Sequence, residues 1–355
     1  MLLRQLTVRD FRNLVSLDLE IPEGGVVIIG ENGQGKTNLL EAIYYLVLFR
    51  SMRGARDREL VRFGQPGFFV AGDADSRVQT GYQLSGRKKK VTVDGTEVFR
   101  LADAVGRFVA IPFSPDDREI ISGGPALRRR FLDVLLSLCE TGYLAQLTTF
   151  RAALKQRNAA LRNGGQAEAA AFDGVFSSAA EFVLGARRRW VERWRKRYSE
   201  LCSRLGEVGD SDIEYKPRSD SAATAAEIRE ELDRTKERDI ASGSTTTGPH
   251  RHDLRLLLAG KSIRRFGSSG QQRTAATALR LLEAAVIRES TGTTPVGLYD
   301  DVFAELDEGR QRRLLDVIGD VLPGQAILAA PRDAEIPGEL FERPRWSMTG
   351  GRIET

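Results

Sequence analysis

The chain contains one run with the composition and spacing of a phosphate-binding loop: Gly30, Glu31, Asn32, Gly33, Gln34, Gly35, Lys36 and Thr37. Glycines permit backbone conformations that turn several N–H groups toward a bound phosphate. Lys36 has the charge and reach to contact the β- and γ-phosphates, and the Thr37 hydroxyl is a suitable ligand for Mg²⁺. The pattern predicts that these eight residues bind a nucleoside triphosphate.

Two adjacent carboxylates, Asp300 and Asp301, follow an apolar run that begins at Pro295. A carboxylate at a strand end beside a phosphate loop usually holds Mg²⁺ directly or through water, so we assign Asp300 to the metal together with Thr37. Asp301 would orient or deprotonate the attacking water. Without the upstream loop, the pair would fit a solvated acidic turn equally well. With it, we predict Lys36, Asp300 and Asp301 as catalytic residues.

A second candidate anion site lies far along the chain, at the start of a predicted helix: Ser268, Gly270 and Gln271. Small residues and a hydroxyl at a helix N-terminus favour an anion. One triphosphate needs only one phosphate loop. A second phosphate-binding helix is explained if it contacts the nucleotide of another copy of the chain, so the pattern predicts a site shared by two copies.

The elements around these residues are those of an α/β protein. A wholly apolar run, 26–29, predicts a buried strand before the loop, and 37–46 has the periodicity of a helix after it. Alternating residues predict half-buried strands at 2–8 and 17–21, and Asp94-Gly95 predicts a hairpin. Further elements complete the pattern: strands at 254–258, 296–299 and 326–329, and a helix at 271–290.

The stretch from about 125 to 240 is rich in Ala, Leu, Arg and Glu, and its periodicity is helical. We therefore predict one discontinuous lobe, residues 1–115 and 245–355, which holds a mixed sheet around the phosphate loop plus antiparallel strands. Residues 116–244 form an inserted helical lobe. Lys36 and Ser268 lie 232 positions apart, which is room for a short lobe and not for a long coiled coil.

The composition excludes several classes of protein. With only two cysteines, Cys139 and Cys202, and two histidines, His250 and His252, a disulfide framework or a multi-histidine metal centre is not expected. We found no apolar run of the roughly 18 residues that a membrane span needs, and the N-terminal residues are not typical of a signal peptide. We therefore expect a cytoplasmic protein with no membrane partner.

The net charge of +4 is weak evidence for a nucleic-acid partner, but the basic residues are clustered. Four clusters stand out: 50–62, 87–90, 128–130, and the cations Arg187, Arg188, Arg189, Arg193, Arg195, Lys196, Arg197 and Arg204. Such clusters suit DNA backbone phosphates, which carry no sequence information. A solvated helix face explains the last cluster about as well, and Trp190 and Trp194, four residues apart, are expected in a core.

The motifs together resemble the ABC-type ATPases: phosphate loop, Ser268 to Gln272, the strand ending in Asp300-Asp301, and Ala304-Glu305-Leu306-Asp307 occur in the order of that superfamily. Within it, the sequence resembles the RecF family of bacterial recombination mediators from residue 1 to about 330. Further runs carry that resemblance: Asp10 to Asn13 with the extended loop Gly30 to Tyr44, Phe113 to Asp117, Arg128 to Asp133, and Gly248 to Arg251 with Asp253.

The resemblance implies an ATP-dependent DNA-binding protein of recombinational repair, replication-fork maintenance and the SOS response. ATP and Mg²⁺ would be its cofactors, and ATP would induce a homodimer that clamps single-stranded, gapped or junction DNA. Its partners would be RecR, RecO and the recombinase that they help to load. The enzyme activity implied is a weak, DNA-dependent ATPase of the ABC type.

Three departures from the ABC pattern point to slow hydrolysis. Asp301 stands where most members have Glu, no histidine follows the last core strand between Gln325 and Arg332, and no glutamine occupies residues 113–118. Other classes of protein remain as alternatives: the energising subunit of a transporter, a clamp that does not hydrolyse ATP, and, least favoured, a small-molecule kinase. The resemblance implies a role for His250 and Arg251 near the nucleotide or a hinge, and a structural role in which Arg251 bridges carboxylates is equally open. Arg12 and Asn13 are candidates for nucleotide contacts.

Overall fold

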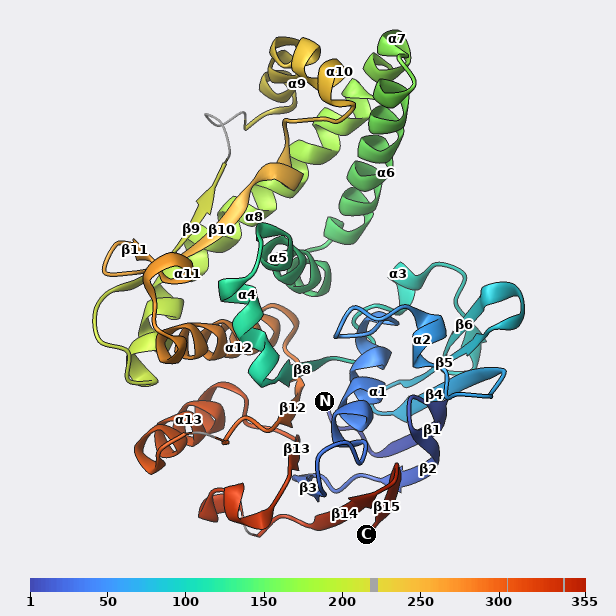
Figure 1. The fold of residues 1–355 in the computed structure, drawn as a ribbon, viewed down its shortest axis with the longest axis vertical. Coiled ribbons are helices and arrows are strands. Elements are labelled where there is room, and N and C mark those ends of the chain that lie inside the picture. Colours follow the sequence, from blue (N-terminus) through green and yellow to red (C-terminus); the bar gives the residue numbers. More distant parts are fainter. Residues whose placement is uncertain (218–222, 305, 341) are drawn as a thin grey trace. The chain divides into compact units, whose positions relative to one another are not determined.

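The computed structural model describes residues 1–217, 223–304, 306–340 and 342–355 (Figure 1). The chain divides into two compact units. Unit 1 comprises Met1–Asp117, Arg204–Gly206 and Thr277–Thr355, and unit 2 comprises Arg118–Ser203 and Glu207–Ala276. Residues 245–276, which we assigned to the ATPase lobe, lie in unit 2 by this division; the lobe boundaries at 115 and 245 stay a prediction.

Unit 1 contains a six-stranded mixed sheet that carries the phosphate loop. Its strand order is β15 (Arg352–Glu354), β14 (Arg345–Thr349), β3 (Gly25–Ile29), β13 (Ala326–Ala330), β12 (Val296–Asp300) and β8 (Ala110–Phe113). Every neighbouring pair is parallel except β14 and β15. Because parallel strands end at the same edge of a sheet, the residues that follow β3 and β12 meet there. The strands predicted at 26–29, 296–299 and 326–329 are confirmed.

A second six-stranded sheet in unit 1 is antiparallel. Its order is β2 (Leu14–Glu20), β1 (Gln5–Phe11), β4 (Gly67–Asp73), β5 (Arg77–Gln83), β6 (Lys88–Val93) and β7 (Thr96–Glu97). Its apolar face packs against helix α1 (Lys36–Leu48), where the rings of Tyr45 and Phe68 are 5.3 Å apart. Asp94 and Gly95 both have positive φ, as a tight β6–β7 turn requires, so the predicted hairpin is confirmed.

The remaining helices of unit 1 are short or lie after the sheet strands: α2 (Asp57–Leu60), α3 (Leu101–Ala104) and α13 (Glu308–Val321). Helix α12 (Ser269–Thr291) begins in unit 2 and continues into unit 1. The sequence analysis did not predict β14 and β15, although Gly350-Gly351 between them is a hairpin signal.

Unit 2 is mainly helical, with α4 (Arg118–Ser122), α5 (Pro125–Cys139), α6 (Tyr143–Arg162), α7 (Gln166–Ala170), α8 (Asp173–Arg204), α9 (Ala225–Arg234), α10 (Lys236–Ser242) and α11 (Ile263–Phe266). It also holds a three-stranded antiparallel sheet, in the order β11 (Lys261–Ser262), β10 (Asp253–Leu258) and β9 (Ser211–Lys216). We had predicted helical structure for most of this region, and β9 was not expected. Its strand forms by pairing with β10, a partner some 40 residues away, which local periodicity does not reveal.

A buried polar network lies at the centre of unit 2. Arg187 is 2% exposed and pairs with Asp133 at 2.6 Å, while its other nitrogens donate to the Tyr143 hydroxyl and the Pro249 carbonyl. Burial without such partners would be very costly for a guanidinium. Arg187 is therefore part of the core, and its assignment to a DNA-contacting cluster is wrong.

The family-like runs of unit 2 belong to the same core. Arg128 is buried and forms a two-pronged ion pair with Asp253, at 2.8 and 2.9 Å, and Arg129 donates to the His252 carbonyl. Trp190 and Trp194 are 4% and 7% exposed, so their predicted place in the core is confirmed. The cluster 128–130 thus has at least one cation, Arg128, that cannot reach DNA.

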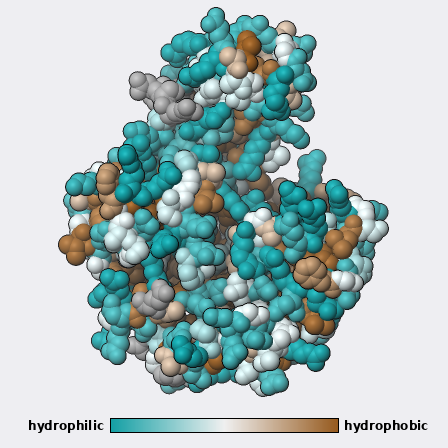
Figure 2. Space-filling view, in the orientation of Figure 1, coloured by the Kyte–Doolittle hydropathy of each residue, from teal (hydrophilic) through white to brown (hydrophobic). Residues whose placement is uncertain are grey.

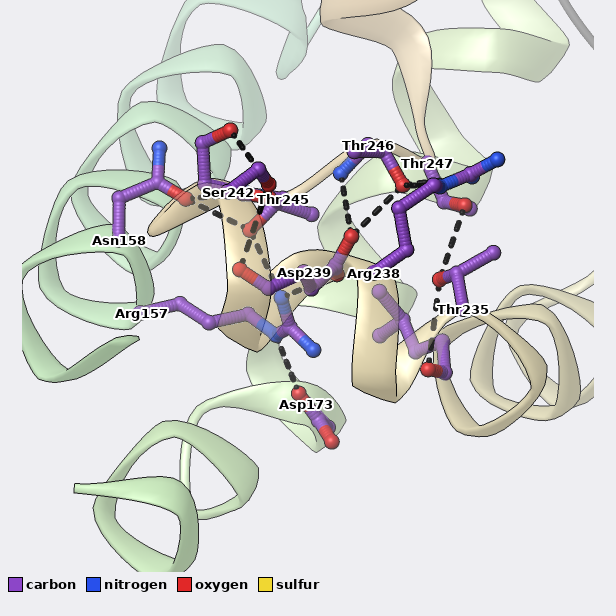
Figure 3. Close-up of polar contacts among 12 residues, drawn as sticks. Arg157, Asn158, Asp173, Thr235, Arg238, Asp239, Ser242, Thr245, Thr246 and Thr247 are labelled. Atoms are coloured by element: carbon purple, nitrogen blue, oxygen red, sulfur yellow. Dashed lines mark hydrogen bonds and ion pairs between the residues drawn. The ribbon is translucent and has the colours of Figure 1, made fainter. Parts of the chain in front are cut away.

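A second network joins α6, α8 and α10 in unit 2 (Figure 3). Arg157 donates to Asp173, Asp239 and the Thr245 hydroxyl, each at 2.8 Å, and fully buried Asp239 accepts from the Thr246 N–H and hydroxyl. These bonds fix Thr245 and Thr246 within the fold. The network is structural, because the partners of Arg157 and of both Asp239 oxygens come from the fold itself.

His250 and Arg251 are held against this segment. His250 Nε2 and the Arg251 guanidinium both contact the Thr245 carbonyl, at 2.9 Å in each case for the nearest nitrogen. The His250 ring packs beside Phe150 and Phe176, and burial lowers its pKa to about 4. The pair has the structural role that we left open, although Arg251 bonds to a carbonyl rather than to carboxylates.

Within the described residues, the segment Gln166–Arg204 is long and apolar enough by composition to cross a membrane. The core helix of a water-soluble protein passes the same test, and α8 within this segment carries the buried side chains of Arg187, Trp190 and Trp194. A guanidinium paired to a carboxylate at the centre of a folded unit marks α8 as a core helix.

Candidate nucleotide site

The phosphate loop joins β3 to α1, as predicted. Gly33 and Gly35 have φ of +82° and +119°, a backbone region that side-chain-bearing residues rarely adopt. Lys36 is buried, and its ammonium donates to the carbonyls of Gly30 at 2.6 Å and Glu31 at 3.1 Å. The cation is thus held inside the curve of the loop, at the N-terminus of a 13-residue helix whose dipole also favours an anion.

Two other segments brace the loop through Gln34. The Asn13 amide donates to the Gln34 carbonyl at 3.0 Å and accepts from the Asn38 amide at 2.8 Å. From the β14–β15 turn, the Gly351 N–H donates to the same carbonyl and the Gly350 N–H donates to Gln34 Oε1, at 2.8 and 2.6 Å. Asn13 was a candidate for contacting nucleotide; the structure places it on the loop backbone instead.

The two predicted aspartates lie beside the loop. Asp300, at the end of β12, is 8% exposed and hydrogen-bonds the Thr37 hydroxyl. Among the described residues, one carboxylate oxygen of Asp300 and one of Asp301 are buried with no hydrogen-bond partner. Buried oxygens of this kind need a donor or a cation. Together with the Thr37 hydroxyl they form the all-oxygen donor set that suits Mg²⁺.

Burial raises the pKa of Asp300 to about 6, and the neighbouring Asp301 adds to the rise, while the Thr37 hydrogen bond and the Lys36 charge oppose it. The pKa of Asp301 is also raised, mainly by burial; Lys36 opposes this and Glu335 adds to it. Asp301 has a φ of +49°, which turns the chain sharply after β12. Both carboxylates are thus kept in a site that disfavours uncompensated negative charge.

We predict that Asp300→Asn stabilises the metal-free protein by about 1–3 kcal/mol at neutral pH, since one pKa unit corresponds to about 1.4 kcal/mol. The folded-state pKa lies above the ordinary value of 3.8, so ionisation destabilises the fold above about pH 6 and this cost disappears below about pH 4. Denaturant unfolding at several pH values measures the effect. As a control, Asp18→Asn should bring no gain, because hydrogen bonds from Arg9 lower the pKa of Asp18.

An acidic residue that the sequence analysis missed is linked to the site through Arg53. Glu41 of α1 is fully buried and accepts from Arg12 at 3.0 Å, Arg53 at 2.6 Å and the Ser51 hydroxyl. Burial alone would raise the pKa of Glu41, but these hydrogen bonds outweigh it and the pKa is lowered. A lone Glu in an otherwise apolar helix was the available signal.

The same cluster accounts for two predicted cations. Arg12, a candidate for nucleotide contacts, is bound to Glu41 instead. Arg53, from the basic cluster 50–62, donates to Glu41 and to the Asn38 side chain at 2.7 Å, and its charge helps to hold down the pKa of Asp300. Arg53 is therefore a cation of the site itself.

The predicted Ser268, Gly270 and Gln271 site lies in unit 2, at the start of α12. The Ser268 hydroxyl accepts from the Gln271 N–H at 3.2 Å, and the Gln271 side chain accepts from the Ser268 N–H at 2.9 Å, a reciprocal capping box. Ser268 is exposed. The structure therefore brings Gly30–Thr37 together with Asp300 and Asp301, whereas Ser268–Gln271 belong to the other unit.

The last motif of the ABC-like order is only partly described. Asp307 caps α13, accepting from the Arg310 N–H at 2.9 Å, and Glu305 lies outside the described residues. In the Phe113–Asp117 run, Asp117 pairs with Arg280 at 2.6 Å within unit 1. Both aspartates have structural partners, so neither is free to bind a ligand without losing them.

No protein-family model matches the chain. Among curated proteins, DNA replication and repair protein RecF of Halalkalibacterium halodurans is 36% identical over 333 residues, 89% of each chain. The protein of the same name from Limosilactobacillus fermentum is 36% identical over 360 residues, 97% of this chain and 96% of the relative.

Solved structures agree with these relatives. The structure described as recombination mediator protein RecF-ATP in the RecFOR pathway has a TM-score of 0.91 at 30% identity, covering 99% of this chain and 97% of that one. An SMC head bound to the C-terminal winged-helix domain of ScpA has a TM-score of 0.54 at 16% identity, which shows the fold alone. These likenesses confirm the α/β fold of an ABC-type ATPase head and the resemblance drawn from the motifs: the chain belongs to the RecF family of DNA replication and repair proteins.

Proposed function

We propose that this chain is an ATP-dependent DNA-binding protein of recombinational repair that ATP closes into a homodimer. The observation that carries the proposal is the juxtaposition of the phosphate loop, the Thr37 hydroxyl and two buried carboxylate oxygens without partners. A relative of the chain is described as bound to ATP, which supports the same ligand here. The chain would act in the cytoplasm, in DNA replication, repair and the SOS response.

The residues divide the chemistry between them. Loop N–H groups and Lys36 bind the β- and γ-phosphates, and Thr37 and Asp300 hold Mg²⁺, which neutralises the charge that develops on the phosphates. Asp301 orients the attacking water. Its side chain is one methylene shorter than the glutamate usual in ABC ATPases, so the water is less well placed and hydrolysis is slow. The expected activity is a weak, DNA-dependent ATPase.

In the dimer, Ser268, Gly270 and Gln271 of one copy complete the phosphate site of the other. The γ-phosphate then touches both chains, so its binding free energy becomes dimerisation free energy. Hydrolysis removes the shared group and the dimer opens. Ser268 is exposed and therefore available for this contact.

DNA binding uses the basic residues that are not buried in the core. Arg189 and Arg195 are exposed and paired with Glu140 and Asp212. Ion pairs of this exposure contribute little to stability, so a DNA phosphate can replace the carboxylate. Binding is then independent of base sequence. We infer single-stranded, gapped or junction DNA as the substrate, and RecR, RecO and the recombinase as partners, from the family.

Sedimentation of the whole protein with ATP, with ADP and without nucleotide, each with and without gapped DNA, tests the proposal. We expect dimers with ATP only, and DNA affinity that falls steeply between about 50 and 200 mM salt as counterion release predicts. Dimers that form equally with ADP would contradict the ATP clamp. An affinity insensitive to salt would contradict the phosphate contacts.

A further inference from the structure

We propose that the outer face of the antiparallel sheet in unit 1 binds single-stranded DNA, with bases against Phe69 and the backbone against Lys88 and Lys90. The inference rests on the DNA binding proposed above and gives it a location and a strand preference. The face is the side of the sheet turned away from α1. It encloses a hollow of about 1000 Å³.

Strand register places the relevant residues in one row. Arg9 of β1 lies opposite Phe69 of β4, Phe69 lies opposite Gly81 of β5, and Gly81 lies opposite Lys90 of β6. Directly paired residues point to the same face, so the four share it. The next row on that face contains Gly67, Gln83 and Lys88. The row from Arg9 to Lys90 crosses four strands, roughly 14 Å at the usual spacing.

The hollow follows from residue types. Gly81, between Phe69 and Lys90, and Gly67, in the next row, contribute no side chain, which lowers the floor of the face at these two positions. Phe68, one position before Phe69, is 4% exposed and stacks on Tyr82 on the inner face. Phe69 is 36% exposed, so its ring is not needed by the core and is free to stack. In Figure 2 further apolar atoms gather on the surface over β5 and β6.

The charges at the rim favour a polyanion. Three cations that line the hollow share this face, Arg9, Lys88 and Lys90, against the two acids Asp10 and Glu97. Arg9 is paired with exposed Asp18. Asp10 is bound to Arg62 at 2.7 Å, and the Lys90–Glu97 pair is exposed, with 63% and 45% of the two side chains accessible. Exposed pairs are weak, so a phosphate can take the place of Glu97.

An aromatic ring flanked by cations distinguishes a single strand from a duplex. Bases stack on a protein ring only when they are unstacked from their own neighbours, and such stacking contributes about 1–3 kcal/mol per base whatever the base. A duplex offers this face only its phosphates. The combination of Phe69 with Lys88 and Lys90 therefore selects single-stranded DNA without reading its sequence.

Phe69→Trp places a fluorescent probe on this face, where its signal can be followed because the native tryptophans, Trp190, Trp194 and Trp346, are all buried. In the full chain with ATP, oligo(dT) should quench the fluorescence of the new tryptophan. Phe69→Ala should weaken oligo(dT) binding at least about fivefold, the lower limit for one stacked base, and leave duplex binding unchanged. Phe63→Ala, an exposed phenylalanine of unit 1 that does not line the hollow, is the matched control.

The double variant Lys88→Ala, Lys90→Ala should lower affinity and reduce the salt slope by about 1–2. Unchanged oligo(dT) affinity in Phe69→Ala, or an equal loss on duplex, overturns the assignment of this face while the proposed DNA binding stands. Absence of DNA binding in the unaltered protein would instead overturn the proposed function.

Discussion

Lys36→Ala is expected to lower the affinity for ATP at least about 100-fold. The Lys36 ammonium is buried in the loop, held by the Gly30 and Glu31 carbonyls, and no other described lysine shares that position. Charge-assisted hydrogen bonds contribute about 1.5–3 kcal/mol each, and about 2.7 kcal/mol already corresponds to a factor of 100. Alanine also removes the charge that opposes the pKa rise of Asp300 and Asp301.

Titration of a fluorescent ATP analogue in the presence of Mg²⁺ measures the effect. Lys89→Ala is the matched control, because Lys89 is a largely buried lysine of the same unit that donates to the Phe49 carbonyl and pairs with Asp57, away from the loop. It should keep the affinity of the unaltered chain. If Lys36→Ala bound ATP within about threefold of that affinity while remaining folded, the loop would not be the phosphate site.

Ser268→Arg is expected to abolish the ATP-induced dimer and leave ATP binding to each chain intact. Ser268 is exposed, so an arginine fits the surface of the single chain, at the cost of the helix cap, about 1 kcal/mol. In the proposed dimer the same side chain would lie against the partner's γ-phosphate, so a side chain as long as arginine would hold the two chains apart. We therefore expect Ser268→Arg to remove the dimer completely and to lower the free energy of unfolding only slightly.

Sedimentation velocity with ATP, alongside ATP titration of the same sample, separates the two effects. Ser290→Arg is the control: it lies near the other end of α12, is also exposed, and should dimerise normally. A Ser268→Arg protein that dimerises with ATP as the unaltered chain does would show that the helix start does not face a second nucleotide. Loss of ATP binding together with the dimer would contradict a site divided between two copies.

Sequence patterns were sufficient to predict the parts of the site that are continuous in the chain. A phosphate loop needs its glycines, lysine and threonine within eight positions, so Gly30–Thr37 could be recognised without knowledge of the fold. Asp300 and Asp301 could be predicted as a site pair because they follow an apolar strand, and two carboxylates end such a strand where they can contact solvent or a metal ion. The ABC-like order of the motifs led to the family, which the relatives confirm.

Tertiary structure alone decided which charges serve the site and which serve the core. Arg187 and Arg189 are of one type and lie two positions apart, yet Arg187 is buried and paired with Asp133, whereas Arg189 is exposed and paired with Glu140. The loop is braced by Asn13, 21 positions before Gln34, and by Gly350, 316 after it. Composition and periodicity report a residue's own preference, whereas burial and pairing depend on segments that only folding brings together, so no local pattern could have shown them.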